Sequence, residues 1–97
     1  MSKTLESKVQ DKLIKELKKA GWVTNKPVQN SYNGWPDIQA FKHPGRTIFI
    51  EVKRKGEKPR KLQKYWIRQL SDMGFPVLIC EGMEDIDEIL NVIAKLR

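Results

Sequence analysis

Two acids and a lysine near the middle of the chain have the spacing of a small catalytic site. Asp37 follows Pro36 directly, and thirteen residues separate it from the sequence Glu51-Val52-Lys53. Hard divalent cations such as Mg²⁺ prefer carboxylate oxygens, water and phosphate as ligands. Because Lys53 can orient or deprotonate a water molecule, or offset developing negative charge, this set is suited to metal-assisted hydrolysis of a phosphate ester.

The strand that must carry Glu51 is predicted over residues 47–54. Alternation along a strand divides its side chains into Ile48, Ile50 and Val52 on one face and Phe49, Glu51 and Lys53 on the other. Both faces begin with apolar residues, so we expect a central strand covered on both sides, where an uncompensated carboxylate is costly. The alternative is that Glu51 and Lys53 form a solvated pair and that Asp37 is a turn residue.

Hydrophobic periodicity and turn residues predict an α/β fold with the order α-β-β-β-α-β-α. The strands before and after residues 43–46 should form an antiparallel hairpin, and the strand, helix, strand order that follows predicts a parallel right-handed crossover. We therefore expect a mixed central sheet flanked by helices, in a single domain over residues 1–97. Helices are predicted over residues 4–20, 61–73 and 84–96, and strands over residues 22–28, 37–42, 47–54 and 75–80.

The charge balance favours a polyanionic partner. The chain has 97 residues, a formal net charge of +7 and a sequence pI near 9.7, as is typical of proteins that bind nucleic acid. Its longest apolar run, from Val77 to Cys80, is too short to span a membrane. The N-terminus lacks the form of a secretory signal, so we expect a cytoplasmic protein. Cys80 is the only cysteine and is predicted to be an ordinary buried thiol.

The motifs resemble those of the PD-(D/E)XK nucleases, whose common core is similar to the predicted α-β-β-β-α-β order followed here by a C-terminal helix. Within that superfamily, Gly34-x-Pro36-Asp37, Glu-Val-Lys and the downstream Leu62-x-x-x-Trp66 resemble the stand-alone VRR-NUC (virus-type replication-repair nuclease) domain. The resemblance covers nearly the whole chain.

This resemblance implies a phage or bacterial endonuclease that acts on branched DNA, most similar to the small Holliday-junction resolvases, which are homodimers. It implies Mg²⁺ or Mn²⁺ as cofactor, with no small-molecule cofactor, and the bacterial cytoplasm as location. The metal ligands that it implies are the side chains of Glu6, Asp37 and Glu51 and the backbone carbonyl of Val52. Two alternatives are a nicking or flap nuclease of the same fold and a DNA-binding module whose carboxylates are inert.

Polar residues interrupt the apolar stripes of the first two helices. In the first helix, Glu6 lies near the middle of the apolar arc with Gln10 beside it. By resemblance, Glu6 supports the metal site and Gln10 assists through water or substrate phosphate; alternatively, Glu6 simply meets solvent in the first turn. The second helix has Leu62, Trp66, Leu70 and Met73 on one face, and Gln63 inside the apolar arc. By resemblance Gln63 holds Lys53 or the water, although a glutamine that merely caps a strand end is the alternative.

Basic residues continue from the proposed site into the second helix. Binding of DNA phosphates by such residues is independent of base sequence and falls with salt. A solvated surface is the alternative, but adjacency to the site favours DNA contact. We expect Trp22, Trp35 and Trp66 to be core or interface aromatics rather than base-stacking platforms. The predicted nucleic-acid-binding residues are Gln10, Ser31, Arg54, Lys55, Lys58, Arg60, Lys61 and Lys64.

Overall fold

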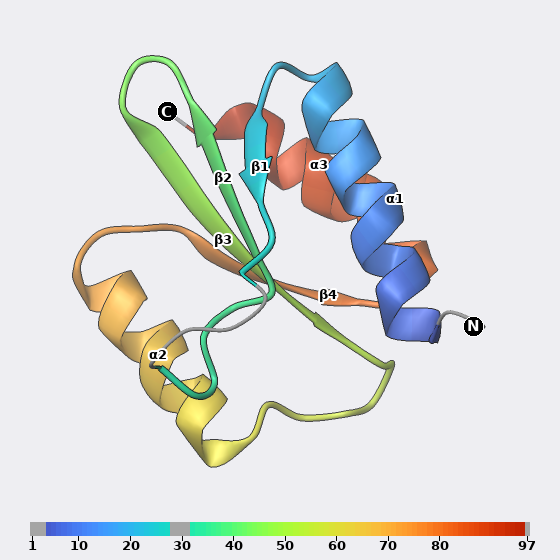
Figure 1. Cartoon of the computed structure of the whole chain (residues 1–97), viewed down its shortest axis with the longest axis vertical. Coiled ribbons are helices and arrows are strands. Elements are labelled where there is room, and N and C mark those ends of the chain that lie inside the picture. Colours follow the sequence, from blue (N-terminus) through green and yellow to red (C-terminus); the bar gives the residue numbers. More distant parts are fainter. Residues whose placement is uncertain (1–3, 28–31, 97) are drawn as a thin grey trace.

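A four-stranded sheet lies between two helices that pack together and a third on its other side (Figure 1). This computed structural model describes residues 4–27 and 32–96. The predicted α/β order is confirmed. The elements are α1 (Leu5–Lys19), β1 (Val23–Asn25), β2 (Ile38–Lys42), β3 (Arg46–Lys53), α2 (Lys61–Asp72), β4 (Val77–Glu81), the 3-10 helix η1 (Met83–Asp85) and α3 (Ile86–Lys95).

Strand β3 is central, with β2 on one side and β4 on the other. The predicted hairpin pairs β2 with β3 antiparallel, so that Ile38 lies opposite Ile50. The predicted crossover through α2 makes β3 and β4 parallel, with Glu51 opposite Ile79. Edge strand β1 is shorter than predicted because it pairs with β2 only as far as Asn25, two residues before Pro27, and proline has no amide hydrogen for a strand ladder.

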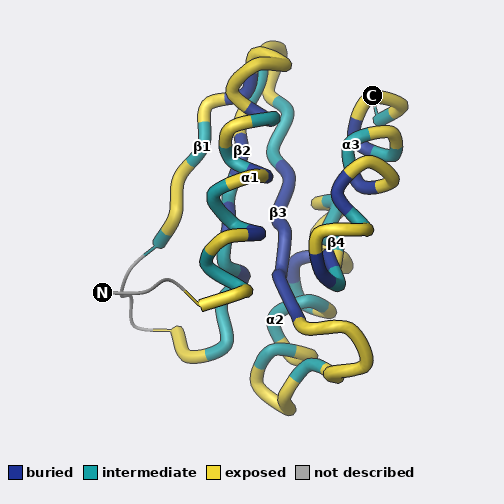
Figure 2. The backbone as a smooth tube through the Cα atoms, turned by 90° about the vertical axis from the view of Figure 1, so that its right-hand side faces the viewer, coloured by how far each residue is buried: buried dark blue, intermediate teal, exposed yellow. Residues whose placement is uncertain are grey.

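The main core lies between the sheet and helices α1 and α3. Helix α1 begins where the Thr4 hydroxyl accepts a hydrogen bond from the Ser7 amide at 3.0 Å, an N-cap that satisfies one free donor of the first turn. The core residues are buried apolar side chains at helical spacing on the helices and at alternate positions on the strands. They include Val9, Leu13, Leu17, Ile38, Ala40, Ile48, Ile50, Val52, Ile86, Ile89 and Ile93. Figure 2 shows β3 as the most continuously buried strand.

Cys80 lies in this core, as predicted, and its thiol donates a 3.4 Å hydrogen bond to the Gly82 carbonyl. Burial, followed by the charges of Asp85 and Glu84, raises the pKa of this thiol to about 11. A thiol with such a pKa stays protonated and unreactive at neutral pH.

The other face of β3 packs against aromatic rings from α2 and the loop before β2. Phe49 contacts Trp35 with ring centroids 5.7 Å apart, and Trp35 contacts Trp66 of α2 at 5.3 Å. The apolar face predicted for the second helix is broader than the face that is buried in α2. Leu62 and Met73, which were predicted to belong to it, are 53% and 63% exposed. In α2 the buried side is its central part, with Leu70 buried and Trp66 half-buried.

None of the helices in the described part of the chain is both long and apolar enough to cross a membrane. The remaining boundaries differ from the predictions at their ends only. Asp37 precedes β2 rather than opening it, and η1 occupies the beginning of the predicted last helix.

Gly34 brings the loop before β2 directly against the first turn of α2. Its φ is +87°, and a Cβ built there lies 2.7 Å from the Leu62 carbonyl carbon and 2.8 Å from the Gln63 nitrogen. Backbone atoms cannot move aside as a flexible side chain can, so this position accepts only glycine. The contact fixes the distance between α2 and the segment that delivers Asp37.

Gly34→Ala should therefore destabilise the protein far more than Gly56→Ala. Gly56 also has a positive φ, +83°, but a Cβ there meets nothing within 4 Å. The control should lose on the order of 1 kcal/mol from backbone strain, whereas Gly34→Ala should lose ~2 kcal/mol more from overpacking. Urea unfolding measures both, and equal losses would contradict the close approach.

Candidate active site

Asp37 is held against β3 by a hydrogen bond. Its Oδ2 accepts the Val52 amide hydrogen at 2.8 Å. The pairing of β2 with β3 ends at Ile38 and Ile50, and just beyond this last pair the Asp37 side chain takes the place of a backbone partner. The buried Pro36 precedes it, so loop and strand together orient the carboxylate toward β3.

Glu51 lies in the middle of the site with its carboxylate withdrawn from solvent. The residue is 1% exposed, and neither Oε1 nor Oε2 has a hydrogen-bond partner among the residues that the structure describes. Buried polar atoms almost always have partners, and an unpaired buried carboxylate is costly. Burial first, and the adjacent Asp37 carboxyl second, raise the Glu51 pKa from 4.5 to about 8, against an opposing contribution from Lys53.

Lys53 lies between a buried and an exposed acid. Its residue is 7% exposed, and its Nζ is 3.9 Å from Glu51 Oε2 and 3.7 Å from Glu57 Oε1. Glu57 belongs to the loop after β3, where its amide donates to the Arg54 carbonyl at 2.9 Å. Sequence reasoning missed this contact, because the conformation of a loop between two elements leaves no periodic signal.

Glu6 lies near the end of β3 but takes a different partner from the one predicted. Its Oε1 is 3.5 Å from Arg54 Nε, and it lines a hollow of about 120 Å³ that also includes Lys53 and Lys55. No group of three or more His, Cys, Asp or Glu side chains able to share a metal occurs within residues 4–27 and 32–96. The three predicted acidic ligands therefore do not form one cluster here, and Glu6 forms an ion pair instead.

Asp37 and Glu51 nevertheless suit a hard divalent cation. Both Glu51 oxygens lack a hydrogen-bond partner among the described residues and are buried beside a second carboxyl group, and a cation would remove the cost that raises the Glu51 pKa. Two carboxylates leave the other positions of an octahedral ion to water and substrate phosphate, as Mg²⁺ prefers. The role of the Val52 backbone carbonyl as a metal ligand stays a prediction.

Gln63 has a local partner. Its Oε1 accepts the Arg60 amide hydrogen at 2.7 Å, at the N-terminus of α2. This is a capping role at a helix end, closer to the alternative raised for Gln63 than to contact with Lys53. Gln10 is half-buried on α1, and Ser31 lies outside the described residues.

The remaining predicted DNA contacts form an exposed basic segment that leaves the active end of β3 and enters α2 (Figure 1). Arg54 has a side chain that is 63% exposed. Of the tryptophans, Trp22 is 6% exposed and belongs to the core, whereas Trp35 and Trp66 are half-buried. The exposed basic residues are Arg54, Lys55, Lys58, Arg60, Lys61 and Lys64.

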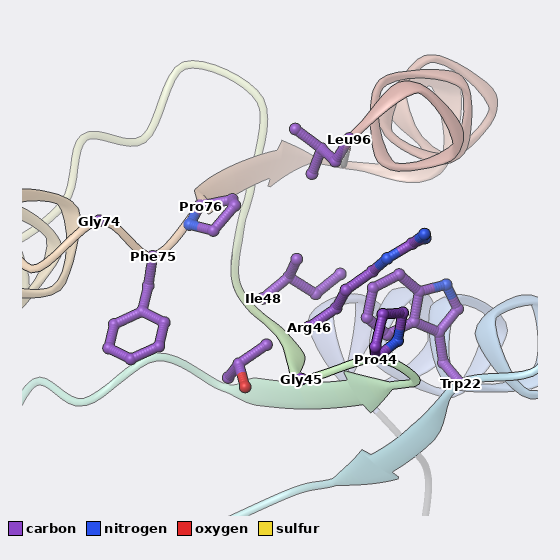
Figure 3. Close-up of a pocket in the computed structure, with 10 residues that line it drawn as sticks. Trp22, Pro44, Gly45, Arg46, Ile48, Gly74, Phe75, Pro76 and Leu96 are labelled. Atoms are coloured by element: carbon purple, nitrogen blue, oxygen red, sulfur yellow. The ribbon is translucent and has the colours of Figure 1, made fainter.

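A larger hollow, of about 320 Å³, lies at the opposite end of β3 (Figure 3). Trp22, Arg46 and Phe75 are among its lining residues, and no acid is. Arg46 and Glu51 are five positions apart along β3, roughly 17 Å at strand spacing. This hollow therefore takes no part in chemistry at the acids.

Three comparisons with known proteins agree with this arrangement. The family model of the VRR-NUC domain matches residues 2–84. A protein named "Putative nuclease p44" from Acyrthosiphon pisum secondary endosymbiont phage 1 is 30% identical over 88 residues, which cover 91% of this chain and 94% of that protein. A solved structure described as a VRR_NUC domain superposes with a TM-score of 0.84 at 22% identity, covering 92% of this chain and 97% of its own. The chain therefore belongs to the VRR-NUC domain family.

Proposed function

We propose that this nuclease domain is a metal-dependent endonuclease that hydrolyses phosphodiester bonds in branched DNA, with four-way junctions as substrate and a homodimer as the acting form. The observation that carries the catalytic part is the buried, unpartnered Glu51 carboxylate beside Asp37 and Lys53. The family and the phage relative support a nuclease. The choice of four-way junctions and of a dimer rests on the resemblance to small resolvases.

Each catalytic residue has a role that follows from its position. Asp37 and Glu51 would hold Mg²⁺ or Mn²⁺, which when bound supplies Lewis-acid activation of the phosphoryl group and a more acidic water molecule. Lys53 is held among carboxylates at the rim of the site. Its ammonium group orients the attacking water or offsets the charge that develops on the phosphate.

The basic segment after β3 supplies affinity. Exposed lysine and arginine side chains between Arg54 and Lys64 adjoin the acids, and they can neutralise phosphates on either side of the scissile bond. Contacts of this kind position the backbone without reading the bases. Binding should accordingly weaken steeply as salt is raised.

Asp37→Asn and Glu51→Gln should each abolish cleavage while leaving DNA affinity equal or higher, because removing a negative charge reduces repulsion of phosphate. We expect each substitution to remove ~4 kcal/mol of transition-state stabilisation, which lowers the rate of cleavage by about a thousandfold. Labelled four-way junction, flap, duplex and single strand are incubated with Mg²⁺ or Mn²⁺, and the products are resolved on gels.

Asp87→Asn is the matched control, since Asp87 is an exposed acid in the first turn of α3. It should cleave at the wild-type rate. Paired symmetric nicks on the junction support resolution, whereas cleavage confined to flaps makes the protein a flap nuclease. DNA binding without cleavage under either metal would establish an inert binding module and end the catalytic proposal.

Glu51 should also make the metal-free protein less stable as pH rises. Its folded-state pKa of about 8 lies above the ordinary glutamate value of 4.5, so between these values the folded chain keeps a proton that the unfolded chain releases. The free energy of unfolding therefore falls with rising pH across this window. The fall should be on the order of 2 kcal/mol larger for wild type than for Glu51→Gln, measured by urea unfolding in EDTA at both ends of the window.

Replacing EDTA with Mg²⁺ or Mn²⁺ at the upper end of the window should restore wild-type stability, because a ligand that binds only the folded state stabilises it. Glu51→Gln should respond little. An equal response of both proteins to the metal would show that the cation binds elsewhere, and an identical pH slope would show that Glu51 is not the titrating group.

A further inference from the structure

The outer face of α2 carries an exposed aromatic ring among cations. Tyr65 is 52% exposed. Lys61 lies four residues before it and Arg68 three after it, so both adjoin Tyr65 on the helix surface. Lys64 lies three residues after Lys61 and four before Arg68, and therefore adjoins both of these cations. All three are exposed. The name "α2 platform" is used below for Tyr65 with these three basic residues.

Ring contacts connect this platform to the catalytic strand. Tyr65 meets Trp66 edge to face at 5.0 Å, Trp66 meets Trp35 at 5.3 Å, and Trp35 meets Phe49 at 5.7 Å. Phe49 shares its face of β3 with Glu51, two residues further on. The platform is therefore held at a fixed position relative to the acids, three ring contacts from the strand that carries one of them.

The cations of the platform are available to an anionic partner. Within the described part of the chain, no acidic group pairs with Lys61 or Lys64, and Arg68 Nε is 3.8 Å from Asp72 Oδ2 with both side chains well exposed. An exposed pair of this kind contributes little to stability, so a phosphate can replace the Asp72 carboxylate. A protein of net charge +7 gains from filling such a surface with a polyanion.

An exposed aromatic ring beside cations matches the chemistry of an unpaired nucleotide. A duplex covers the faces of its bases by stacking and presents only their edges in the grooves, whereas an unpaired strand offers base faces and phosphates together. Stacking of a base on an aromatic side chain contributes ~1–3 kcal/mol and tolerates any base. A second copy of the chain fits less well, because two facing platforms would bring like charges together.

We propose that the α2 platform binds an unpaired segment of the DNA substrate next to the cleavage site, with Tyr65 stacking on a base and Lys61, Lys64 and Arg68 contacting its phosphates. The proposal rests on the nuclease function above and specifies the part of a branched substrate that the protein recognises. It assigns substrate contacts to Tyr65 and Arg68 in addition to the two lysines.

The test measures how Tyr65→Ala changes affinity for a fluorescent single-stranded oligothymidine and for a duplex of the same length, by anisotropy in EDTA. Affinity for the single strand should fall about tenfold, as the loss of one stacked base predicts, and affinity for the duplex should be unchanged. Tyr65→Phe keeps the ring and should bind as wild type. Met73→Ala is a second control, since Met73 is 63% exposed beyond the end of α2.

An equal loss on both DNAs, or no loss on either, would overturn the platform. So would a Tyr65→Ala protein that changes its sedimentation but not its affinity for the single strand, because the ring would then serve contact with a second copy. Cleavage of branched DNA by wild type is measured in parallel. Failure there contradicts the nuclease proposal, whereas cleavage combined with unchanged single-strand affinity of Tyr65→Ala contradicts the platform alone.

Cross-linking of the unaltered protein gives an answer even if Tyr65→Ala does not fold. A single strand containing 5-bromouracil is bound, irradiated and digested with trypsin, which cuts after Lys64 and Arg68 and releases the peptide of residues 65–68. Attachment of the uracil to that peptide supports the platform. Attachment exclusively to other peptides would refute it.

Discussion

The architecture depends on one costly feature, a carboxylate buried in the central strand without a hydrogen-bond partner among the described residues. Glu51 lies on β3 between two other strands, with α1 and α3 on one face and the aromatic residues on the other. Replacement by an apolar residue would remove the cost, so stability alone does not explain an acid there. Lys53 compensates only in part, since its ammonium is 3.9 Å from the nearest oxygen and the Glu51 pKa remains raised.

Asp37 both organises the site and adds to the electrostatic cost of burying Glu51. By accepting the Val52 amide hydrogen it ties the beginning of β2 to the active end of β3. The same hydrogen bond holds a second carboxyl group beside Glu51, where it contributes to the raised pKa. Gly34 fixes this segment from the opposite side through its contact with the backbone of α2. Both acids are thus held in place by the backbone before any ligand arrives.

The parts of this arrangement that could be predicted from sequence are those governed by local periodicity. Alternation along β3 placed Glu51 and Lys53 on one face, and the turn at residues 43–46 paired that strand with the one following Asp37. Side-chain partners across the fold could not be predicted in the same way. Glu6 lies in the apolar arc of α1 yet pairs with Arg54, and Gln63 caps its own helix, because each choice depends on where a separate loop passes.

Electrostatics at two distances explains why the exposed basic segment after β3 surrounds the site while Lys53 lies within it. Among the described residues, Lys53 pairs with Glu51 and its ammonium also contacts Glu57, so little of its positive charge remains for a phosphate. A net charge of +7 attracts a polyanion at longer range, and on the proposed function the exposed cations after β3 would hold its phosphates beside the acids. On the proposed function, a cation would take the place of the proton that the raised pKa keeps on Glu51, and a phosphate could then approach both acids. The burial that keeps Glu51 neutral without a ligand would then also be what makes cleavage depend on the metal.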